Sequence, residues 1–268
     1  MFKSPFKRII SCLLASLLVQ AASAQPAANT KTSPLPTRKV LVVMTNHAAY
    51  PSRSDTTGLW LTELTHFYDV IQQAGYTMDF VSPQGGNVPL DERSLGWLYM
   101  DEAAKAHLQD PAFTERLRTT KSAASANPAD YLAIYYTGGH GTMWDFMGNK
   151  DLQRVAEAIY RQGGIVSSVC HGAAGLLDLQ TEEGRPLVDG RLITGFSNTE
   201  EVLSGVKDQV PFSLQDELLS RGARYDKSNI PFWSYVVTDG RLVTGQNPSS
   251  GKAVAKALLR AIQVNHIQ

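Results

Sequence analysis

Apolar and polar residues follow one another along the chain in blocks that predict alternating strands and helices. A β-branched run at residues 39–45 is typical of a strand buried on both faces, and residues 59–74 follow with helical spacing up to Gly75. Further strands are expected at residues 76–81, 131–136, 165–169, 192–194 and 235–244, and further helices at residues 151–162 and 254–264. This alternation predicts an α/β fold with a mostly parallel sheet sandwiched by helices.

The loops after the strands are the expected location of the chemistry, because ligands of parallel sheets bind beyond the carboxyl ends of the strands. The loops at residues 46–58, at residues 138–148 and from Cys170 onward follow the first, third and fourth expected strands. We expect these three loops to converge. Residues 91–130 are interpreted as a mainly helical insertion within the same domain.

The N-terminus has the pattern of a cleavable secretory signal peptide over residues 1–24. Basic residues precede an apolar stretch at residues 9–19, which is too short to span a bilayer, and Ala22-Ser23-Ala24 is an A-x-A cleavage site. The alternative is a buried N-terminal helix. Residues 25–37, rich in Ala, Pro, Thr and Ser, are expected to be a flexible linker. Residues 38–268 then form a single α/β domain of a periplasmic or secreted protein.

Charge and cysteine content narrow the possible partners. The chain has 25 basic and 25 acidic residues and no basic stripe, so no nucleic-acid partner is predicted. No apolar run after the signal is long enough to cross a membrane, so no membrane partner is expected either.

Of the two cysteines, Cys12 leaves with the signal. Cys170 is then a lone thiol in an oxidising compartment, which marks either a reactive group or a buried, inert cysteine.

Cys170 stands where the expected strand at residues 165–169 meets a run of small residues that reads as the start of a helix. That layout is a nucleophile elbow after a central strand, and a helix N-terminus stabilises a thiolate. His171 follows directly and can reach the thiol only if the backbone bends sharply. Its imidazole needs a carboxylate to orient it, and both Glu200 and Glu201 are candidates.

Two further features supply candidate chemistry. Glu63 lies beside the apolar stripe of its helix, so its carboxyl is expected to face the core, where burial raises its pKa and suits it to acid/base work; the alternative is a solvated helix-face glutamate. A turn at Gly138, Gly139 and His140 has backbone amides that can bind an oxyanion or substrate. The alternative is a plain glycine turn. The histidines lack metal-ligand spacing, so neither a metal nor another cofactor is expected.

Six motifs in this order resemble the ThiJ/PfpI superfamily, and within it the heat-shock-protein-31-like branch that includes glutathione-independent glyoxalases. The resemblance implies the class I glutamine amidotransferase-like fold, which is flavodoxin-like. The motifs, which span almost the whole chain after the linker, are GLWLTE at 58–63, VSPQGG at 81–86, GGHGTMWD at 138–145, VCHG at 169–172, TGF at 194–196 and LVTGQNP at 242–248.

The resemblance also implies roles for the candidate residues. By motif position, Cys170 is the nucleophile, His171 its partner and Glu63 the acid/base, and the triad acid falls on Glu201. Gly139 and the backbone amide of His171 would form the oxyanion site. The late H-x-E motif of true glutamine amidotransferases is absent, which disfavours amide transfer.

The activity implied is a cofactor-independent glyoxalase III, a lyase of the D-lactate dehydratase type. It would convert a small reactive aldehyde, methylglyoxal or a related 2-oxoaldehyde, to a D-lactate-type hydroxy acid through a cysteine hemithioacetal. The resemblance also implies a homodimer. The alternatives are a stress-response holdase chaperone, a cysteine redox sensor, or a protein deglycase or hydrolase that uses the same site.

Overall fold

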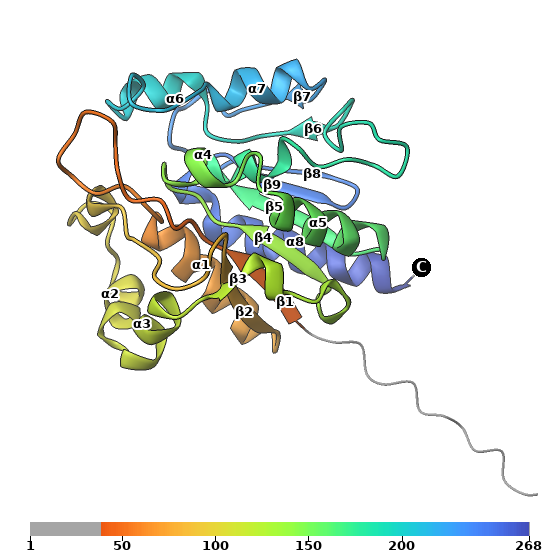
Figure 1. Ribbon diagram of the computed structural model, residues 1–268, viewed down its shortest axis with the longest axis horizontal. Helices are drawn as coiled ribbons and strands as arrows, with labels where there is room; N and C mark the ends of the chain where they lie inside the picture. Colours follow the sequence, from red (N-terminus) through yellow and green to blue (C-terminus); the bar gives the residue numbers. More distant parts are fainter. Residues whose placement is uncertain (1–38, 268) are drawn as a thin grey trace, which may run out of the picture. The chain divides into compact units, whose positions relative to one another are not determined.

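A computed structural model describes residues 39–267, and its centre is a seven-stranded sheet with the strand order β3-β2-β1-β4-β5-β9-β8 (Figure 1). The strands are β1 Lys39–Val43, β2 Thr77–Ser82, β3 Lys121–Ser122, β4 Ala133–Tyr136, β5 Ile165–Val169, β8 Val236–Asp239 and β9 Leu242–Gly245. Neighbouring strands pair in parallel, except for the antiparallel β8–β9 hairpin. The predicted mostly parallel α/β fold is confirmed.

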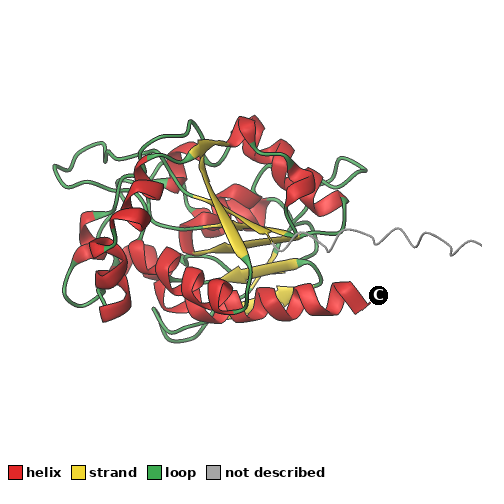
Figure 2. Ribbon diagram, turned by 90° about the horizontal axis from the view of Figure 1, so that it is seen from below, coloured by secondary structure: helices red, strands yellow, loops and turns green. Residues whose placement is uncertain are grey.

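Helices lie on both sides of the sheet (Figure 2). They are α1 Leu61–Gln73, α2 Glu102–Gln109, α3 Pro111–Arg118, α4 Thr142–Asp145, α5 Lys150–Arg161, α6 Asn198–Leu203, α7 Leu214–Ser220 and α8 Gly251–Ile267. Short 3-10 helices are η1 Glu92–Leu95, η2 Ala123–Ser125, η3 Pro128–Asp130, η4 Cys170–Leu176 and η5 Pro248–Ser250. Helices α1 and α8 pack on each other, and α5 packs on β4 and β5. In residues 39–267, none of the helices has the length and apolar character needed to cross a bilayer.

Three central strands bring the expected loops together. Strand β4 lies between β1 and β5, with Tyr136 in register with Val43 on one side and Ser168 on the other. Because the three strands are parallel, the loops that follow them leave the same edge of the sheet. The amide of Trp60 donates to the carbonyl of Gly138 (3.2 Å), which ties the first loop to the second.

The structure differs from the sequence-based expectations in its short elements. The strand expected at residues 192–194 does not join the main sheet, but forms β6 (Leu192–Ile193), which pairs with β7 (Arg224–Tyr225) in a separate two-stranded sheet. Residues 91–130 contain α2 and α3 and also β3, an edge strand next to β2. The helix expected from residue 59 begins at Leu61, because Leu59 pairs with the backbone at residues 89–91. The expected signal peptide and linker lie outside the described residues.

The first helix is anchored to the sheet by an aromatic pair. The ring of Phe67 stacks on that of Tyr135, with centroids 3.6 Å apart, and the Tyr135 hydroxyl donates to the carbonyl of Glu63 (2.9 Å). Both rings are fully buried. This contact fixes α1 in rotation and height over β4, and therefore fixes the direction in which Glu63 points.

Replacing Phe67 with alanine should remove this anchor. We expect Phe67→Ala to lower the free energy of unfolding by about 3–5 kcal/mol, because a large buried ring is lost and a cavity remains. Denaturant titration followed by circular dichroism measures the change. Gln72→Ala, at an exposed position of the same helix, should stay within about 0.5 kcal/mol of the unmodified protein. Equal losses in the two variants would contradict this account of the anchor.

Candidate active site

Cys170 sits in a strained elbow directly after β5. Its φ is +55°, and in the described chain Phe232 is the one other non-glycine residue with a positive φ. Two glycines make room for the turn: a Cβ at Gly172 would lie 2.4 Å from the carbonyl oxygen of Tyr136, and one at Gly175 would lie 2.5 Å from the Tyr136 ring. Such strain persists only where the surroundings enforce it, and it clusters at active sites.

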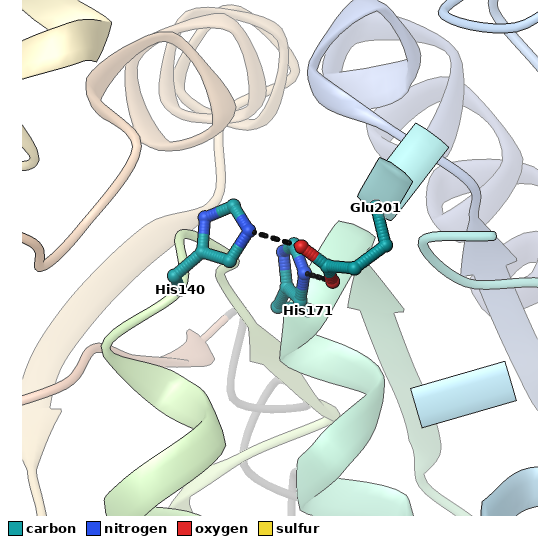
Figure 3. Close-up of side chains that lie close together, drawn as sticks. All are labelled: His140, His171 and Glu201. Carbon is teal, nitrogen blue, oxygen red and sulfur yellow. Dashed lines mark hydrogen bonds and ion pairs between the residues drawn. The ribbon is translucent and has the colours of Figure 1, made fainter. Parts of the chain in front are cut away.

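Cys170, His171 and Glu201 form a hydrogen-bonded series. The Cys170 sulfur lies 3.3 Å from Nδ1 of His171, and Nε2 of His171 lies 2.7 Å from Oε2 of Glu201. Figure 3 shows this bond, and a second one from His140 to the other oxygen of the Glu201 carboxylate. A carboxylate only accepts, so the proton of the His171 ring is on Nε2, and Nδ1 is free to take the thiol proton. The structure therefore brings together three of the residues predicted from the sequence.

A second histidine shares the same carboxylate. Nε2 of His140 donates to Oε1 of Glu201 (2.8 Å), and Nδ1 of His140 accepts from the guanidinium of Arg93 (2.8 Å). Burial, with the neighbouring His171 and Arg93, lowers the pKa of His140 to about 4, so this ring is neutral. Its ring is thus fixed in one tautomer and holds Glu201 in place. The prediction placed His140 in the oxyanion or substrate-binding site. Its ring is committed to Glu201, but the residue also lines the cavity above Cys170, so a contact with substrate stays a prediction.

Sequence reasoning missed Arg93 and its support. The guanidinium pairs with the fully buried carboxylate of Asp91 (2.7 Å) and also contacts the Tyr50 hydroxyl. Asp91 caps η1 through the backbone amide of Arg93 (3.0 Å). The one sequence signal was an Asp that starts a short helical turn, which is too common to predict a site.

His140, His171 and Glu201 also form the one group in the described chain with suitable atoms for a metal ion, all within 4.8 Å of one another. In this network Nε2 of each histidine carries a proton directed at Glu201, so neither Nε2 atom has a lone pair available for a metal. If Nε2 of His140 gave up its proton, Nδ1 would have to carry it. The Nδ1–H group would then face the N–H of Arg93, so that two donors would oppose each other. The residues fit a hydrogen-bond network better than a metal site.

Glu63 is fully buried beside Cys170. Neither carboxyl oxygen has a hydrogen-bond partner of good geometry. Burial raises the carboxyl's pKa to about 8, although the nearby Cys170 thiol and Gly138 amide work in the opposite direction. A Cβ at Gly138 would lie 2.3 Å from Oε2 of Glu63 and 2.7 Å from Cβ of Cys170. Glycine at this position therefore lets the carboxyl and the cysteine approach each other.

The thiol itself differs from the sequence-based expectation. Burial raises the pKa of Cys170 well above its usual value, the charge of Glu63 raises it further, and the His171 amide lowers it. The expected helix N-terminus is the start of the 3-10 helix η4, and its effect does not outweigh burial. The resting group is thus a neutral thiol, which forms a thiolate only when a neighbour takes its proton.

The two glycines of the predicted oxyanion site have different environments. The Gly138 amide lies near the Glu63 carboxyl, whose pKa it lowers, and the place of Gly138 in the oxyanion site stays a prediction. Gly139 has a φ of +99°, and a Cβ there would lie 2.1 Å from the carbonyl oxygen of Gly58. Gly139 and His171 both line the cavity above Cys170. Their backbone amides stay the predicted oxyanion donors.

A cavity of about 350 Å³ opens above the Cys170 sulfur. Four aromatic residues and Arg93 form much of its wall. The aromatic residues are Trp60, Tyr99, Phe196 and Phe232. A polar base under mostly apolar walls is typical of a site that binds a small organic molecule.

Comparisons with known proteins give consistent matches over this region. The profile of the DJ-1/PfpI family matches residues 56–261. The chain is 35% identical to the glutathione-independent glyoxalase HSP31 of Saccharomyces cerevisiae, over 84% of this chain and 98% of the yeast protein. The crystal structure of glyoxalase III from Candida albicans superposes with a TM-score of 0.79 at 31% identity, covering 84% of this chain and 98% of that one. The Rapid Encystment Protein of 24 kDa from Francisella tularensis superposes with a TM-score of 0.80 at 37% identity, with the same coverage.

The raised pKa of Glu63 predicts a pH-dependent stability. Between about pH 4.5 and pH 8 the folded protein keeps a proton on Glu63 that the unfolded chain releases. The free energy of unfolding should therefore fall as pH rises through this window, by up to about 1.4 kcal/mol per pH unit from this group. Glu63→Gln lacks the ionisation, so the stability of the unmodified protein minus that of the variant should decrease with pH.

Urea titrations at several pH values measure this difference. Glu115→Gln, at an exposed position of α3, is the matched control and should give a difference that is constant with pH. If the Glu63→Gln curve ran parallel to that of the unmodified protein across the window, the carboxyl would not be buried as described.

Proposed function

We propose that this chain, which belongs to the DJ-1/PfpI family, is a glutathione-independent glyoxalase of the glyoxalase III type. It converts methylglyoxal and related 2-oxoaldehydes to D-lactate-type hydroxy acids without a cofactor. The observation that carries the proposal is a thiol that lies near both the His171 ring, which can accept its proton, and the buried Glu63 carboxyl, below a small cavity. Relatives that carry the name glutathione-independent glyoxalase or glyoxalase support it.

The first step is addition of the thiol to the aldehyde. Nδ1 of His171 takes the proton of Cys170, and Glu201 stabilises the resulting imidazolium through Nε2. The thiolate sulfur then bonds to the aldehyde carbon, and the carbonyl electron pair moves to oxygen. The amides of Gly139 and His171 stabilise that oxyanion until His171 returns the proton to it, which gives a hemithioacetal.

The second step moves a proton between the two substrate carbons. Ionised Glu63 removes the proton from the former aldehyde carbon, which gives an enediolate, and then delivers that proton to the neighbouring carbon. The hydroxyl proton of the former aldehyde carbon passes to the oxygen of the neighbouring carbon, so that a carbonyl forms on the first carbon and a hydroxyl on the second. The product of this step is a thioester of the hydroxy acid. A carboxyl with a pKa of about 8 has comparable tendencies to accept and to donate near neutral pH. Water then cleaves the thioester, which releases the hydroxy acid and restores the thiol.

The alternatives receive less support. Redox-sensing cysteines are accessible and have a lowered pKa, whereas burial raises the pKa of Cys170. A holdase would not require the arrangement of Cys170, His171 and Glu63. A deglycase or hydrolase would use the same residues, and the names of the relatives favour glyoxalase activity.

The glyoxalase proposal predicts D-lactate formation from methylglyoxal without glutathione. Cys170→Ala should abolish it, because no covalent adduct can form. Glu63→Gln should lower kcat by about 10²–10⁴-fold, because the proton transfer between carbons loses its base. A chiral assay of lactate measures both effects, and Glu115→Gln serves as the control. D-lactate formation by Cys170→Ala at the rate of the unmodified protein would refute the proposal.

Export is a separate proposal that rests on residues 1–24 alone. We expect expression in a bacterial host to yield a periplasmic protein whose N-terminus is Gln25, since Ala22-Ser23-Ala24 is a cleavage site. Intact-mass measurement of the periplasmic fraction tests this. Ala24→Leu should block cleavage, because the peptidase needs a small residue there. Recovery of the uncleaved chain in the cytoplasm would contradict the proposal. The homodimer stays a prediction that sedimentation measurements can test.

A further inference from the structure

Phe232 has the second strained backbone conformation in the described chain. Its φ is +60°, a region that a bulky side chain rarely adopts. It lies between β7 and β8, and its ring lines the cavity above Cys170 while remaining 42% exposed. Strain of this kind has a free-energy cost and persists only where neighbouring contacts enforce it.

Glu200 supplies the contact that holds this segment. Its fully buried carboxylate accepts the backbone amide of Phe232 on Oε1 (2.7 Å), together with Nδ2 of Asn247 (2.9 Å). Its other oxygen accepts the amide and hydroxyl of Ser197 at the start of α6 (3.0 and 2.8 Å). The carboxylate therefore links α6 to the cavity wall. Asn247 extends the link by donating to the carbonyl of Trp233 (2.7 Å).

The cavity that Phe232 helps to enclose is large and aromatic for a substrate with only a methyl substituent. Phe232 and Phe196 lie with ring centroids 6.1 Å apart, and Phe196 lies 4.3 Å from the His171 ring. Trp60 and Tyr99, 4.9 Å apart, form further aromatic wall. The volume of about 350 Å³ is within the range, about 300–1,000 Å³, that commonly holds drug-sized ligands.

We propose that Phe232 is a specificity-determining residue that favours 2-oxoaldehydes with an aromatic or branched apolar substituent over methylglyoxal, and that Glu200 is its positioning residue. The inference rests on the proposed glyoxalase activity. The reaction at Cys170 and Glu63 is unchanged, and the substituent packs against Phe232 and Phe196, which both line the cavity. An apolar group that fills an apolar site commonly improves discrimination by about 10–200-fold.

Phenylglyoxal and methylglyoxal distinguish this preference. We expect kcat/KM from initial rates, with mandelate and lactate as products, to be at least about 10-fold higher for phenylglyoxal in the unmodified protein. Phe232→Ala should lower both values and should lower the phenylglyoxal value more, so that the ratio approaches one. Phe232→Gly, which tolerates the positive φ, should give the same ratio without a folding defect. Phe232→Tyr should retain the preference.

Two further variants distinguish a positioning role of Glu200 from a general loss of folded structure. Glu200→Gln should reduce the substrate ratio, whereas a purely structural defect would lower both rates and leave the ratio unchanged. Trp233→Ala, at a neighbouring side chain that is 62% exposed, should leave both rates unchanged. Turnover of methylglyoxal with no preference for phenylglyoxal, or a preference that survives in Phe232→Gly, overturns this inference and leaves the glyoxalase proposal intact. No turnover of either aldehyde overturns both.

Discussion

The site depends on the burial of two acidic groups, the Glu63 carboxyl and the Cys170 thiol, next to each other at the end of the sheet. Burial raises the pKa of each, and a negative charge on either one opposes a negative charge on the other. The resting pair therefore keeps its protons and becomes reactive only when a proton can move. Gly138 is what allows the approach, because any side chain there would occupy the space between them.

Two neighbouring carboxylates on α6 hold different parts of this region in place. Successive residues of a helix point about 100° apart, so Glu200 and Glu201 face different surroundings. Glu201 accepts a hydrogen bond from His171 on one oxygen and from His140 on the other, and it orients the base that takes the thiol proton. Glu200 is held at the start of the helix and fixes the backbone of Phe232. One short helix thereby positions both the proton acceptor and part of the cavity wall.

The sequence predicted the larger elements of the fold because each carried enough residues to show a pattern. Apolar residues and glycine stops predicted the strands β1, β4 and β5 and the helix α5. The predicted family is confirmed as well. The two-residue strands β3 and β7 carry no pattern of their own. They exist because backbone groups that meet in space form hydrogen bonds, which only the tertiary fold decides.

In the site, too, some features depend on local spacing in the sequence and others only on the tertiary fold. By itself, the sequence determined the lone thiol at a strand end, the adjacent histidine and a glutamate beside an apolar stripe, because each of these depends on local spacing. Local spacing left Glu200 and Glu201 as alternatives and the family resemblance pointed to Glu201, whose contact with His171 the structure shows. Only the tertiary structure decided that His140 and Arg93 support this carboxylate and that Phe232 lines the cavity. These contacts join segments that are far apart along the chain. Their distances depend on how the loops of β1, β4 and β5 pack at one edge of the sheet.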